Sequence, residues 1–340
     1  MKVFVTGGCG FIGSNFIRHV LSSTDDVRVT NLDALTYAGN PANLRAYADD
    51  PRYAFVRGDV GDDALIAEVL PGHDAVVNFA AETHVDRSIT RSRPFVQTNV
   101  VGANTIFEAA MRTGVERFLH ISTDETYGSI VEGSSHEGDA LQPNSPYAAS
   151  KAAADLLAGA YRVTYGYAIT LTRTTNNFGP YQYPEKIVPL FITNLIDGDM
   201  VPVYGTGTNV RDWIYVEDNA AAQWHVLING VPGEVYNVGT GNEMTNLELA
   251  RRLVAAFGAG EDRIRFVSDR PGHDLRHSVH TTKVRALGWA PAVDFDTALA
   301  RTINWYRGHE EWWRPLKARG DSPAPRAASD PSVCGSVVKR

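Results

Sequence analysis

A tyrosine and a lysine four residues apart, Tyr147 and Lys151, are the first candidates for chemistry in this sequence. On a helix this spacing places both side chains on one face. A nearby ammonium group favours the phenolate and lowers the pKa of a tyrosine from its usual value of about 10. The pair therefore predicts a tyrosine that acts as a base near neutral pH. The same spacing also occurs by chance on helix surfaces, so this interpretation needs other residues to support it.

Two adjacent carboxylic acids, Asp124 and Glu125, follow Ser122 and Thr123 at the end of an apolar stretch. A hydride transfer alone needs one base, which Tyr147 would supply. Two further proton carriers suggest that hydride transfer is coupled to a second proton-transfer event, such as the elimination of water. A solvated loop is the alternative interpretation of such an acidic pair.

A glycine-rich segment over residues 6–13 has the sequence context of a dinucleotide-binding turn. It follows the apolar run 3–5, which is typical of a strand, and it precedes an amphipathic stretch that contains Phe16 and Val20. Glycines allow the backbone to approach a pyrophosphate, and the N-terminus of the following helix favours its negative charge. Strand, glycine turn and helix together predict a bound dinucleotide.

The residue that follows the second predicted strand indicates which dinucleotide binds. This strand covers residues 27–32 and ends at Asp33, about 20 residues after Gly13. A carboxylate at this point can bind the adenosine ribose hydroxyls and would repel a 2′-phosphate. The sequence therefore predicts NAD rather than NADP.

The composition is that of an ordinary globular protein, with 44% hydrophobic and 21% charged residues among 340. Such a chain can bury one large core or split into two domains. Its formal net charge of −7 indicates no general affinity for nucleic acid. No apolar run approaches the roughly 20 residues of a membrane span, and no secretory signal is recognised. We therefore expect a cytoplasmic protein without membrane or nucleic-acid partners.

Cysteines and histidines give no sign of a disulfide framework or a metal site. The two cysteines, Cys9 and Cys334, are too few for a framework, and Cys9 is expected to serve as a small residue in the glycine turn. His84, His120, His273 and His277 are scattered, and no Cys/His cluster has the spacing of metal ligands. The sequence predicts no metal.

Strands alternate with helices over the first half of the chain. Further strands are predicted at 53–56, 74–79, 117–122 and 167–173, and helices at 94–112 and 146–165. This alternation predicts an α/β fold with a doubly wound parallel sheet of the Rossmann type. Ligands bind beyond the carboxyl ends of such strands. One cleft could therefore collect Asp33, Asp59, Ala80, Ala81, residues 123–125 and Asn176.

The alternation weakens after about residue 176, where glycine and proline become frequent. Two amphipathic helices are predicted there, at 246–257 and 296–312. We expect residues 1–175 to form the NAD-binding domain that carries the catalytic residues. Residues 176–317 are expected to form a smaller mixed α/β lobe that crosses back in part to the first domain. Residues 318–340 lack periodicity and are predicted to be a disordered tail.

The chain resembles the extended short-chain dehydrogenase/reductase superfamily and, within it, the dTDP-glucose 4,6-dehydratases. The resemblance runs from residue 2 to about residue 315. Seven segments carry it in order, at residues 6–14, 35–40, 79–88, 122–128, 176–182, 210–213 and 269–274.

This resemblance implies a role for each matched position. Residues implied in NAD binding are Gly7, Gly10, Phe11, Ile12, Gly13, Asp33, Asp59, Val60, Ala80, Ala81, Thr83, Tyr147 and Lys151. Residues implied in catalysis are Thr123, Asp124, Glu125, Tyr147 and Lys151. Residues implied in binding the nucleotide sugar are His84, Thr123, Asn176, Glu185, Lys186, Arg211, Asn246, Arg270 and His273. Surface charge is the alternative for any one of these arginines taken alone.

The implied activity converts dTDP-glucose to dTDP-4-keto-6-deoxyglucose and water, with a tightly bound NAD that is regenerated in each turnover. Tyr147 would take the proton of the 4-hydroxyl, Glu125 the C5 proton, and Asp124 would protonate the departing 6-hydroxyl. A homodimer built through the helices 94–112 and 146–165 is also implied. The alternatives are a nucleotide-sugar 4-epimerase of the same superfamily, a nucleotide-sugar decarboxylase, and a non-catalytic NAD-binding protein.

Four positions depart from the pattern of the resembled family. Thr83, Thr126, His277 and His280 stand where serine, valine, tyrosine and aspartate are usual. The two histidines are expected near the nucleotide pocket. Their presence leaves open which nucleotide base and which sugar the protein prefers.

Overall fold

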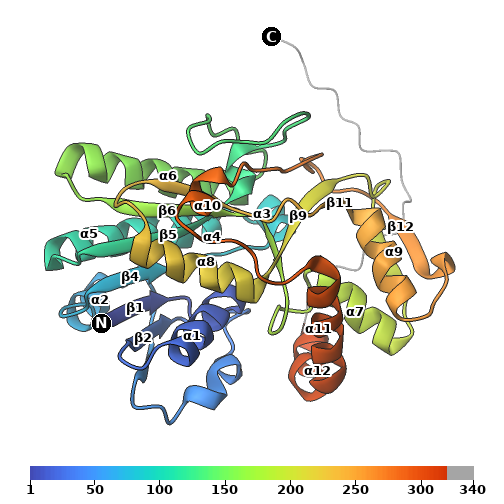
Figure 1. Cartoon of the computed structure of the whole chain (residues 1–340), viewed down its shortest axis with the longest axis horizontal. Coiled ribbons are helices and arrows are strands. Elements are labelled where there is room, and N and C mark those ends of the chain that lie inside the picture. The colour runs from blue at the N-terminus through green and yellow to red at the C-terminus, as the bar shows by residue number, and fades with distance from the viewer. Residues whose placement is uncertain (320–340) are drawn as a thin grey trace.

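A computed structural model describes residues 1–319, and at its centre lies a parallel sheet of seven strands with helices on both faces (Figure 1). The strand order is β10-β6-β5-β4-β1-β2-β3. The strands are β1 (Lys2–Thr6), β2 (Arg28–Asp33), β3 (Tyr53–Arg57), β4 (Ala75–Asn78), β5 (Arg117–Thr123), β6 (Ile169–Thr174) and β10 (Val235–Val238). The order reverses at β1, between β2 and β4, which is where ligands bind in such sheets. The predicted doubly wound α/β fold is confirmed.

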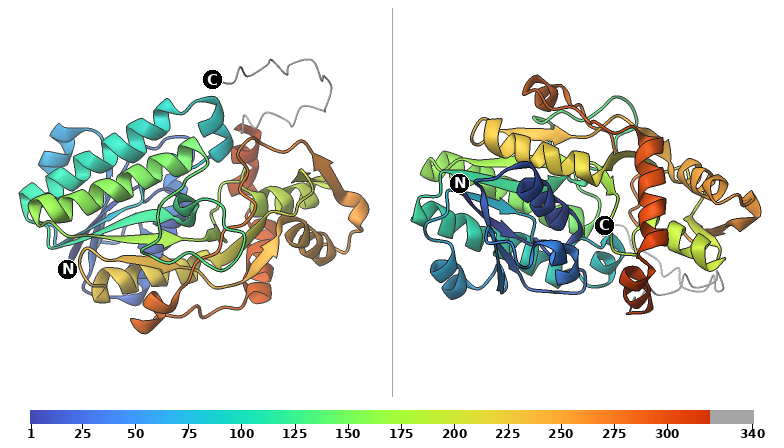
Figure 2. Two further views of the ribbon diagram at one scale, coloured as in Figure 1. Left: turned by 90° about the horizontal axis from the view of Figure 1, so that it is seen from above. Right: turned by 60° about the horizontal axis from the view of Figure 1, so that its bottom comes forward.

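Side chains of β1 show why the sheet is buried on both faces. Val3 and Val5 pack against α1 (Phe11–Ser23) and α8 (Val216–Asn229) in one core cluster. Phe4 points to the opposite face, since side chains alternate along a strand, and joins α5 (Ala103–Thr113) and α6 (Pro146–Tyr165) in another. Figure 2 shows α5 and α6 side by side on that face. Parallel strands with both faces covered need continuous apolar runs.

A second lobe has its own core and lies beyond the carboxyl ends of the central strands (Figure 1). Its helices are α7 (Ile187–Asp197), α9 (Asn246–Ala256), α11 (Phe295–Gly308) and α12 (Glu310–Arg319). Its strands are β7 (Asn176–Phe178), β8 (Val201–Tyr204), β9 (Val210–Tyr215), β11 (Glu243–Thr245) and β12 (Ile264–Val267). Because α8 and β10 return to the first core and the central sheet, the boundary at residue 175 stays a prediction.

Short elements complete the described chain. They are α2 (Asp63–Val69), α3 (Val85–Thr90), α4 (Arg93–Val96), α10 (Thr282–Ala286), the π-helix η2 (Gln97–Gly102), and the 3-10 helices η1 (Pro41–Tyr47), η3 (Asp124–Tyr127) and η4 (Glu261–Arg263). Within residues 1–319 no helix has the length and apolar character needed to cross a bilayer. The same residues hold no group of three or more His, Cys, Asp or Glu side chains placed to bind a metal ion.

Two predicted helices differ from the structure. The helix predicted at 94–112 is α4 and α5 joined by the π-helical η2, where the Asn99 side chain bonds the backbone of Glu82 instead of facing solvent. The helix predicted at 296–312 is broken between α11 and α12, because His309 leaves the helical conformation with φ of −133°. Residues 318 and 319, predicted as part of a disordered tail, belong to α12. The rest of that tail, 320–340, lies outside the described residues.

Candidate active site

The glycine turn between β1 and α1 forms a tight cradle. Gly7 has φ of +70°, and a Cβ there would lie 2.6 Å from the backbone nitrogen of Ala80. A Cβ on Gly13 would overlap the carbonyl oxygen of Gly7. The N-cap residue of α1 is Gly10, which has no side chain that could accept a hydrogen bond from the first N–H groups of the helix. The first N–H groups of α1 are therefore left for an anionic ligand such as a pyrophosphate.

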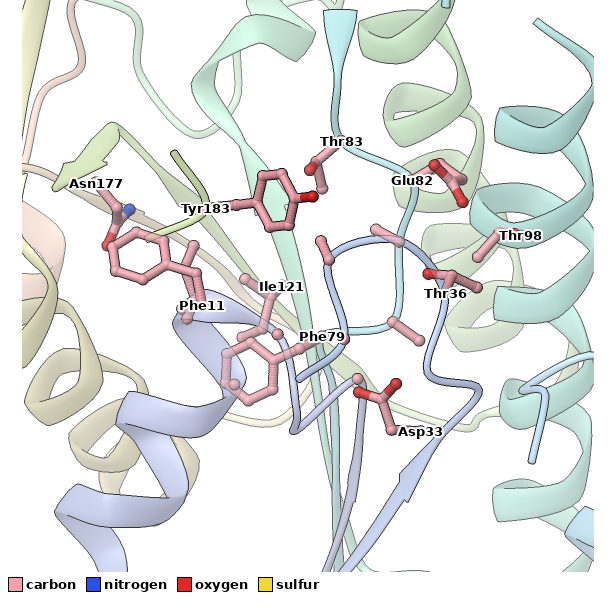
Figure 3. Close-up of a pocket in the computed structure, with 18 of the residues that line it drawn as sticks. Phe11, Asp33, Thr36, Phe79, Glu82, Thr83, Thr98, Ile121, Asn177 and Tyr183 are labelled. Carbon is pink, nitrogen blue, oxygen red and sulfur yellow. The ribbon is translucent and has the colours of Figure 1, made fainter. Parts of the chain in front are cut away.

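Asp33 is fixed at the end of β2 beside this turn. Its Oδ2 accepts a hydrogen bond from the backbone N–H of Cys9 and its Oδ1 from that of Leu35, each at 2.8 Å. Burial raises the pKa of Asp33 above its usual value, and the two N–H groups oppose that shift. The carboxylate is thus held in one orientation at the edge of the cavity that Figure 3 shows. These features fit the adenosine ribose and pyrophosphate of NAD.

One cavity brings together the predicted cofactor and catalytic residues. Its lining includes Gly7, Gly10, Phe11, Ile12, Gly13, Asp33, Asp59, Val60, Ala80, Ala81, Thr83, Thr123, Asp124, Glu125, Tyr147 and Lys151. Asn176, Glu185 and Lys186 of the predicted sugar-binding set also line it. His84, Arg211, Asn246, Arg270 and His273 do not line this cavity. Asn246 begins α9, and its backbone N–H donates to the carbonyl of Asn209.

Tyr147 lies in the first turn of α6, which Ser145 caps by accepting the N–H of Ala148 at 3.1 Å. Burial raises the pKa of Tyr147 well above its usual value, the charge of Glu125 raises it further, and the hydroxyl of Thr123 opposes the shift. The expected lowering by Lys151 is therefore contradicted for this tyrosine.

The contacts of Lys151 explain why it does not lower the pKa of Tyr147. Its Nζ donates to the carbonyl of Ile121 at 2.6 Å and lies 3.5 Å from His120 Nε2. Burial lowers the pKa of Lys151 to about 8. Its ammonium is thus directed at the end of β5. The spacing of four residues predicted that Tyr147 and Lys151 share a helix face, but it could not show that the ammonium points away from the tyrosine oxygen toward β5.

Asp124 and Glu125 lie in η3, directly after β5, and their surroundings differ. Thr123 Oγ1 donates to Asp124 Oδ1 at 3.2 Å and accepts the N–H of Glu125 at 3.3 Å. Asp124 is buried, and burial raises the pKa of its carboxyl to about 6, with the charge of His277 opposing. Glu125 is half-buried at the cavity. A carboxyl that stays protonated at higher pH suits proton donation.

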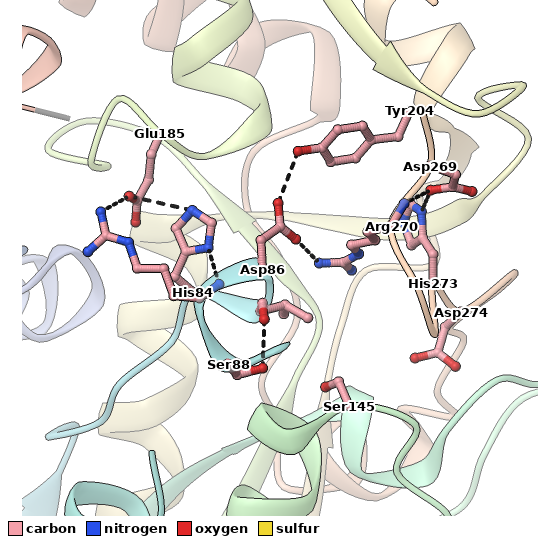
Figure 4. A network of polar contacts seen from close by, with 12 residues as sticks. His84, Asp86, Ser88, Ser145, Glu185, Tyr204, Asp269, Arg270, His273 and Asp274 are labelled. Carbon is pink, nitrogen blue, oxygen red and sulfur yellow. Dashed lines mark hydrogen bonds and ion pairs between the residues drawn. The ribbon is translucent and has the colours of Figure 1, made fainter. Parts of the chain in front are cut away.

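A polar network links the second lobe to α3 (Figure 4). Glu185, with a side chain only 2% exposed, accepts a hydrogen bond from Arg87 at 3.0 Å and lies 3.5 Å from His84 Nε2. Burial lowers the pKa of His84 to about 3. Lys186 Nζ donates to the carbonyl of Thr83 at 2.9 Å. Two residues of the predicted sugar-binding set, His84 and Glu185, are therefore in direct contact.

The same network reaches the segment after β12. Arg270 pairs with Asp86 at 3.0 Å, and His273 pairs with Asp269 at 2.7 Å. Arg211 is buried in β9, and its Nη2 donates to the carbonyl of Asp274 at 2.9 Å. Its charge acts on Glu125 and Asp124. Arg270 therefore contacts α3 through Asp86, and Arg211 is held by the segment that follows β12.

The structure adds cavity residues that the sequence did not reveal. Trp312 and Leu316 of α12 line the cavity, and Trp312 Nε1 donates to Asn43 Oδ1 at 2.9 Å. Tyr37 also lines it, with the guanidinium of Arg87 4.0 Å from its ring centre. Nothing in the sequence marked Trp312 as a cavity residue, because an aromatic residue on an amphipathic helix usually belongs to a core. Tyr37 lies inside a segment that carried the resemblance.

Comparison with known proteins extends over nearly the whole chain. The family model described as GDP-mannose 4,6 dehydratase matches residues 4–302. A dTDP-glucose 4,6-dehydratase of Streptomyces niveus is 54% identical over 323 residues, which cover 94% of this chain and 96% of that relative.

Comparison with solved structures gives the same result as comparison with sequences. DesIV, a dTDP-glucose 4,6-dehydratase of Streptomyces venezuelae solved with NAD bound, is 51% identical with a TM-score of 0.91, over 93% of this chain and 100% of that one. A UDP-glucose 4-epimerase of Thermotoga maritima is 27% identical with a TM-score of 0.84, over 91% of this chain and 99% of that one. The chain therefore belongs to the GDP-mannose 4,6 dehydratase family and, within it, to the dTDP-glucose 4,6-dehydratases.

Proposed function

We propose that the chain converts dTDP-glucose to dTDP-4-keto-6-deoxyglucose and water. The observation that carries this proposal is the placement of two carboxyl groups, Asp124 and Glu125, beside Tyr147 at one cavity. A 4-epimerase of the same fold needs the tyrosine but no acid pair. The chain is also less similar to the epimerase, at 27% identity, than to the dehydratase, at 54% identity.

The cofactor is NAD, and the glycine cradle and Asp33 fit it. The chemistry that NAD supplies when bound is reversible hydride transfer, first from C4 and later to C6 of the sugar. Gly7, Gly10 and Gly13 would hold its pyrophosphate, and Asp33 its adenosine ribose.

Oxidation at C4 requires removal of the proton on the 4-hydroxyl. We assign this role to Tyr147, and with substrate bound the Thr123 hydroxyl would turn from Asp124 Oδ1 and donate a hydrogen bond to the 4-oxygen. Burial without a nearby charge partner makes a phenolate costly in the free chain. Because only the phenolate can accept the sugar proton, Tyr147 must first release its own proton to solvent, and we infer that binding of cofactor and substrate favours this release.

Elimination follows because a ketone at C4 makes the C5 proton acidic. Glu125 takes that proton, and the electron pair of the broken C5–H bond forms the C5=C6 double bond. The C6–O bond breaks with its electrons on oxygen, and Asp124 donates the proton that converts the departing hydroxyl group to water. Asp124 ends this step as a carboxylate. Glu125 later returns a proton to C5 as C6 is reduced.

Positive side chains of the second lobe suit a nucleoside diphosphate. Lys186 lines the cavity, Arg211 donates to the carbonyl of Asp274, and Arg270 pairs with Asp86 of α3. Guanidinium groups offer rigid forks of donors to phosphate oxygens. We propose that these three cations, with His84, Asn176, Glu185, Asn246 and His273, bind the nucleotide sugar.

Incubation of the protein with dTDP-glucose tests the proposal, because a 4-keto sugar nucleotide develops a characteristic absorbance in base. We expect this absorbance with the unmodified protein and its loss in the double variant Asp124→Asn with Glu125→Gln. Formation of dTDP-galactose would support the epimerase. Parallel reactions with UDP-, GDP- and CDP-glucose measure the preference for the base.

A homodimer through α5 and α6 is part of the proposal. Helix α6 exposes large apolar side chains, among them Leu156 at 67% and Val163 at 87%. Exposed apolar side chains of this size on one helix suit a protein interface. Leu156→Glu should convert the dimer to a monomer in size-exclusion chromatography. A cytoplasmic location also belongs to the proposal, since NAD and nucleotide sugars are metabolites of that compartment.

A further inference from the structure

Asp86 joins the two lobes through a single carboxylate (Figure 4). Its Oδ2 accepts a hydrogen bond from the hydroxyl of Tyr204 at 3.0 Å, and its Oδ1 accepts one from Nη1 of Arg270 at 3.0 Å. Asp86 lies in the first turn of α3, which packs beside α6 of the first lobe, whereas both of its partners belong to the second lobe. Asp86 does not line the cavity, and the proposed mechanism gives it no role.

The ends of two paired strands bring Tyr204 and Arg270 to this carboxylate. Strands β8 and β12 run parallel, and Tyr204 at the end of β8 lies opposite Val267 at the end of β12. Arg270 follows three residues later, in a turn that Asp269 holds. Asp269 Oδ1 accepts the backbone N–H of Arg270 at 2.8 Å and lies 2.7 Å from His273 Nδ1. The backbone at Arg270 is therefore fixed, and Asp86 fixes the far end of its side chain.

The guanidinium of Arg270 still has a donor for a further partner. A guanidinium carries five N–H donors, and the bond to Asp86 uses one of them at Nη1. Its Nε is buried and has no hydrogen-bond partner among residues 1–319. A buried donor without a partner is uncommon and costly, and a phosphate oxygen would satisfy it. Burial disfavours ionisation of Asp86, but its hydrogen bonds with Arg270 and Tyr204 hold the pKa of this carboxyl below its usual value.

We propose that Asp86 is a positioning residue, which holds the guanidinium of Arg270 in the orientation that binds the diphosphate of the nucleotide sugar. This inference rests on the proposed function. An arginine side chain gives up rotational freedom when it binds a ligand, and a side chain that Asp86 already holds has less to lose. The carboxylate also repels a phosphate. Because the guanidinium that pairs with it offsets this charge, the orienting effect should exceed the repulsion.

The test is the affinity for dTDP of Asp86→Asn, a substitution that keeps the shape of the side chain and removes its charge. Calorimetric titration of the NAD-loaded protein with dTDP measures this affinity. We expect roughly tenfold weaker binding, because a hydrogen bond between charged groups is lost. The KM for dTDP-glucose should rise by a similar factor while kcat stays within about twofold. The NAD content should not change. Unchanged or tighter binding of dTDP would overturn the inference.

A double-mutant cycle shows whether Asp86 acts through Arg270. Arg270→Gln should itself weaken the binding of dTDP. When Asp86→Asn is added to Arg270→Gln, we expect no further loss, because the group that Asp86 orients is already gone. Losses that multiply in the double variant would show that Asp86 acts by another route, and would overturn the inference.

Glu243→Gln is the matched control, because Glu243 pairs with Arg276 at 2.7 Å inside the second lobe. The side chains of this pair are 28% and 20% exposed, close to the 33% and 20% of Asp86 and Arg270. The control should leave the affinity for dTDP unchanged.

Tyr204→Phe decides the matter if Asp86→Asn does not fold, because it removes one of the two hydrogen bonds of Asp86 and keeps the ring. It should weaken dTDP binding roughly two- to fivefold, and an affinity equal to that of the control would overturn the inference. Failure of the unmodified protein to form the deoxy product would instead overturn the proposed function.

Discussion

Asp124 and Glu125 are neighbours in sequence that meet different surroundings at the end of β5. Asp124 is buried next to Thr123, and burial raises the pKa of its carboxyl, while Glu125 is half-buried at the cavity. Two identical chemical groups can carry an acid role and a base role when their environments separate their proton affinities. This difference is the residue-scale basis of the proposed elimination.

Asp124→Asn should block the protonation of the departing hydroxyl and leave the oxidation at C4 intact. NADH should therefore accumulate on the enzyme when dTDP-glucose is added, and its absorbance measures this directly. Loss of a general acid typically slows a step by roughly 10²–10⁴-fold. Product formation at the unmodified rate would show that another group donates the proton.

The same variant should stabilise the folded chain at alkaline pH. The pKa of Asp124 is raised to about 6 in the folded protein, so its ionised form opposes folding above that pH. Removal of the charge should raise the free energy of unfolding at pH 8 by about 2 kcal/mol. The gain should shrink as the pH falls through 6, where the native carboxyl takes up its proton. Urea unfolding at pH 5 and pH 8 provides the comparison.

Asp33→Asn should weaken the discrimination between NAD and NADP. The amide oxygen can still accept one backbone hydrogen bond, so the turn is kept, but the negative charge that repels a 2′-phosphate is lost. Reconstitution of stripped protein with each dinucleotide measures the effect. Equal reconstitution of the unmodified protein by both would show that Asp33 does not carry the preference.

At the scale of elements, the strands and the helix 146–165 could be predicted from the sequence. Their apolar periodicity is local, and residues such as proline and glycine mark where they begin and end. The bounds of α6 are those predicted, since Pro146 and Gly166 mark its ends. The π-helical η2 could not be derived. It depends on Asn99, whose amide reaches the backbone of Glu82, a residue remote in sequence. Long-range hydrogen bonds of this kind leave no local pattern.

Asn99→Ala tests the importance of η2. The native amide accepts the N–H of Glu82 at 2.8 Å and donates to its carbonyl at 3.0 Å, which fixes the loop that carries Ala80 to Thr83. Its loss should lower the free energy of unfolding by about 1–3 kcal/mol and weaken NAD retention. Asn104→Ala, which removes from α5 the acceptor of a hydrogen bond that Tyr161 of α6 donates, is the control and should leave NAD retention unchanged. Equal NAD retention in both variants would contradict the role of Asn99.

At the scale of the whole molecule, one lobe supplies the cofactor cradle and the acid pair, and the other supplies the cations. The sequence predicted the residues of the cavity through the motifs it matched, yet it missed the contribution of α12. Trp312 joins the lobes by its hydrogen bond to Asn43, which itself donates to the carbonyl of Cys9 in the glycine turn. A contact over this sequence distance has no local signature.

Trp312→Phe should loosen this connection without removing the aromatic packing. The lost hydrogen bond should speed NAD release roughly two- to tenfold, as measured by exchange with labelled NAD. Trp305→Phe, in the same aromatic cluster but without a hydrogen bond to the first lobe, serves as the control. Indistinguishable release rates would mean that α12 does not retain the cofactor.

The most direct test of the central claim follows one hydrogen atom through the whole reaction. The substrate is dTDP-glucose carrying deuterium at C4, in ordinary water, and the product is analysed by mass and NMR. An internal hydride transfer coupled to elimination predicts that the deuterium appears at C6 of the 4-keto-6-deoxy sugar, with a solvent proton at C5. Deuterium retained at C4 of an epimerised sugar, or lost to solvent, would contradict the account.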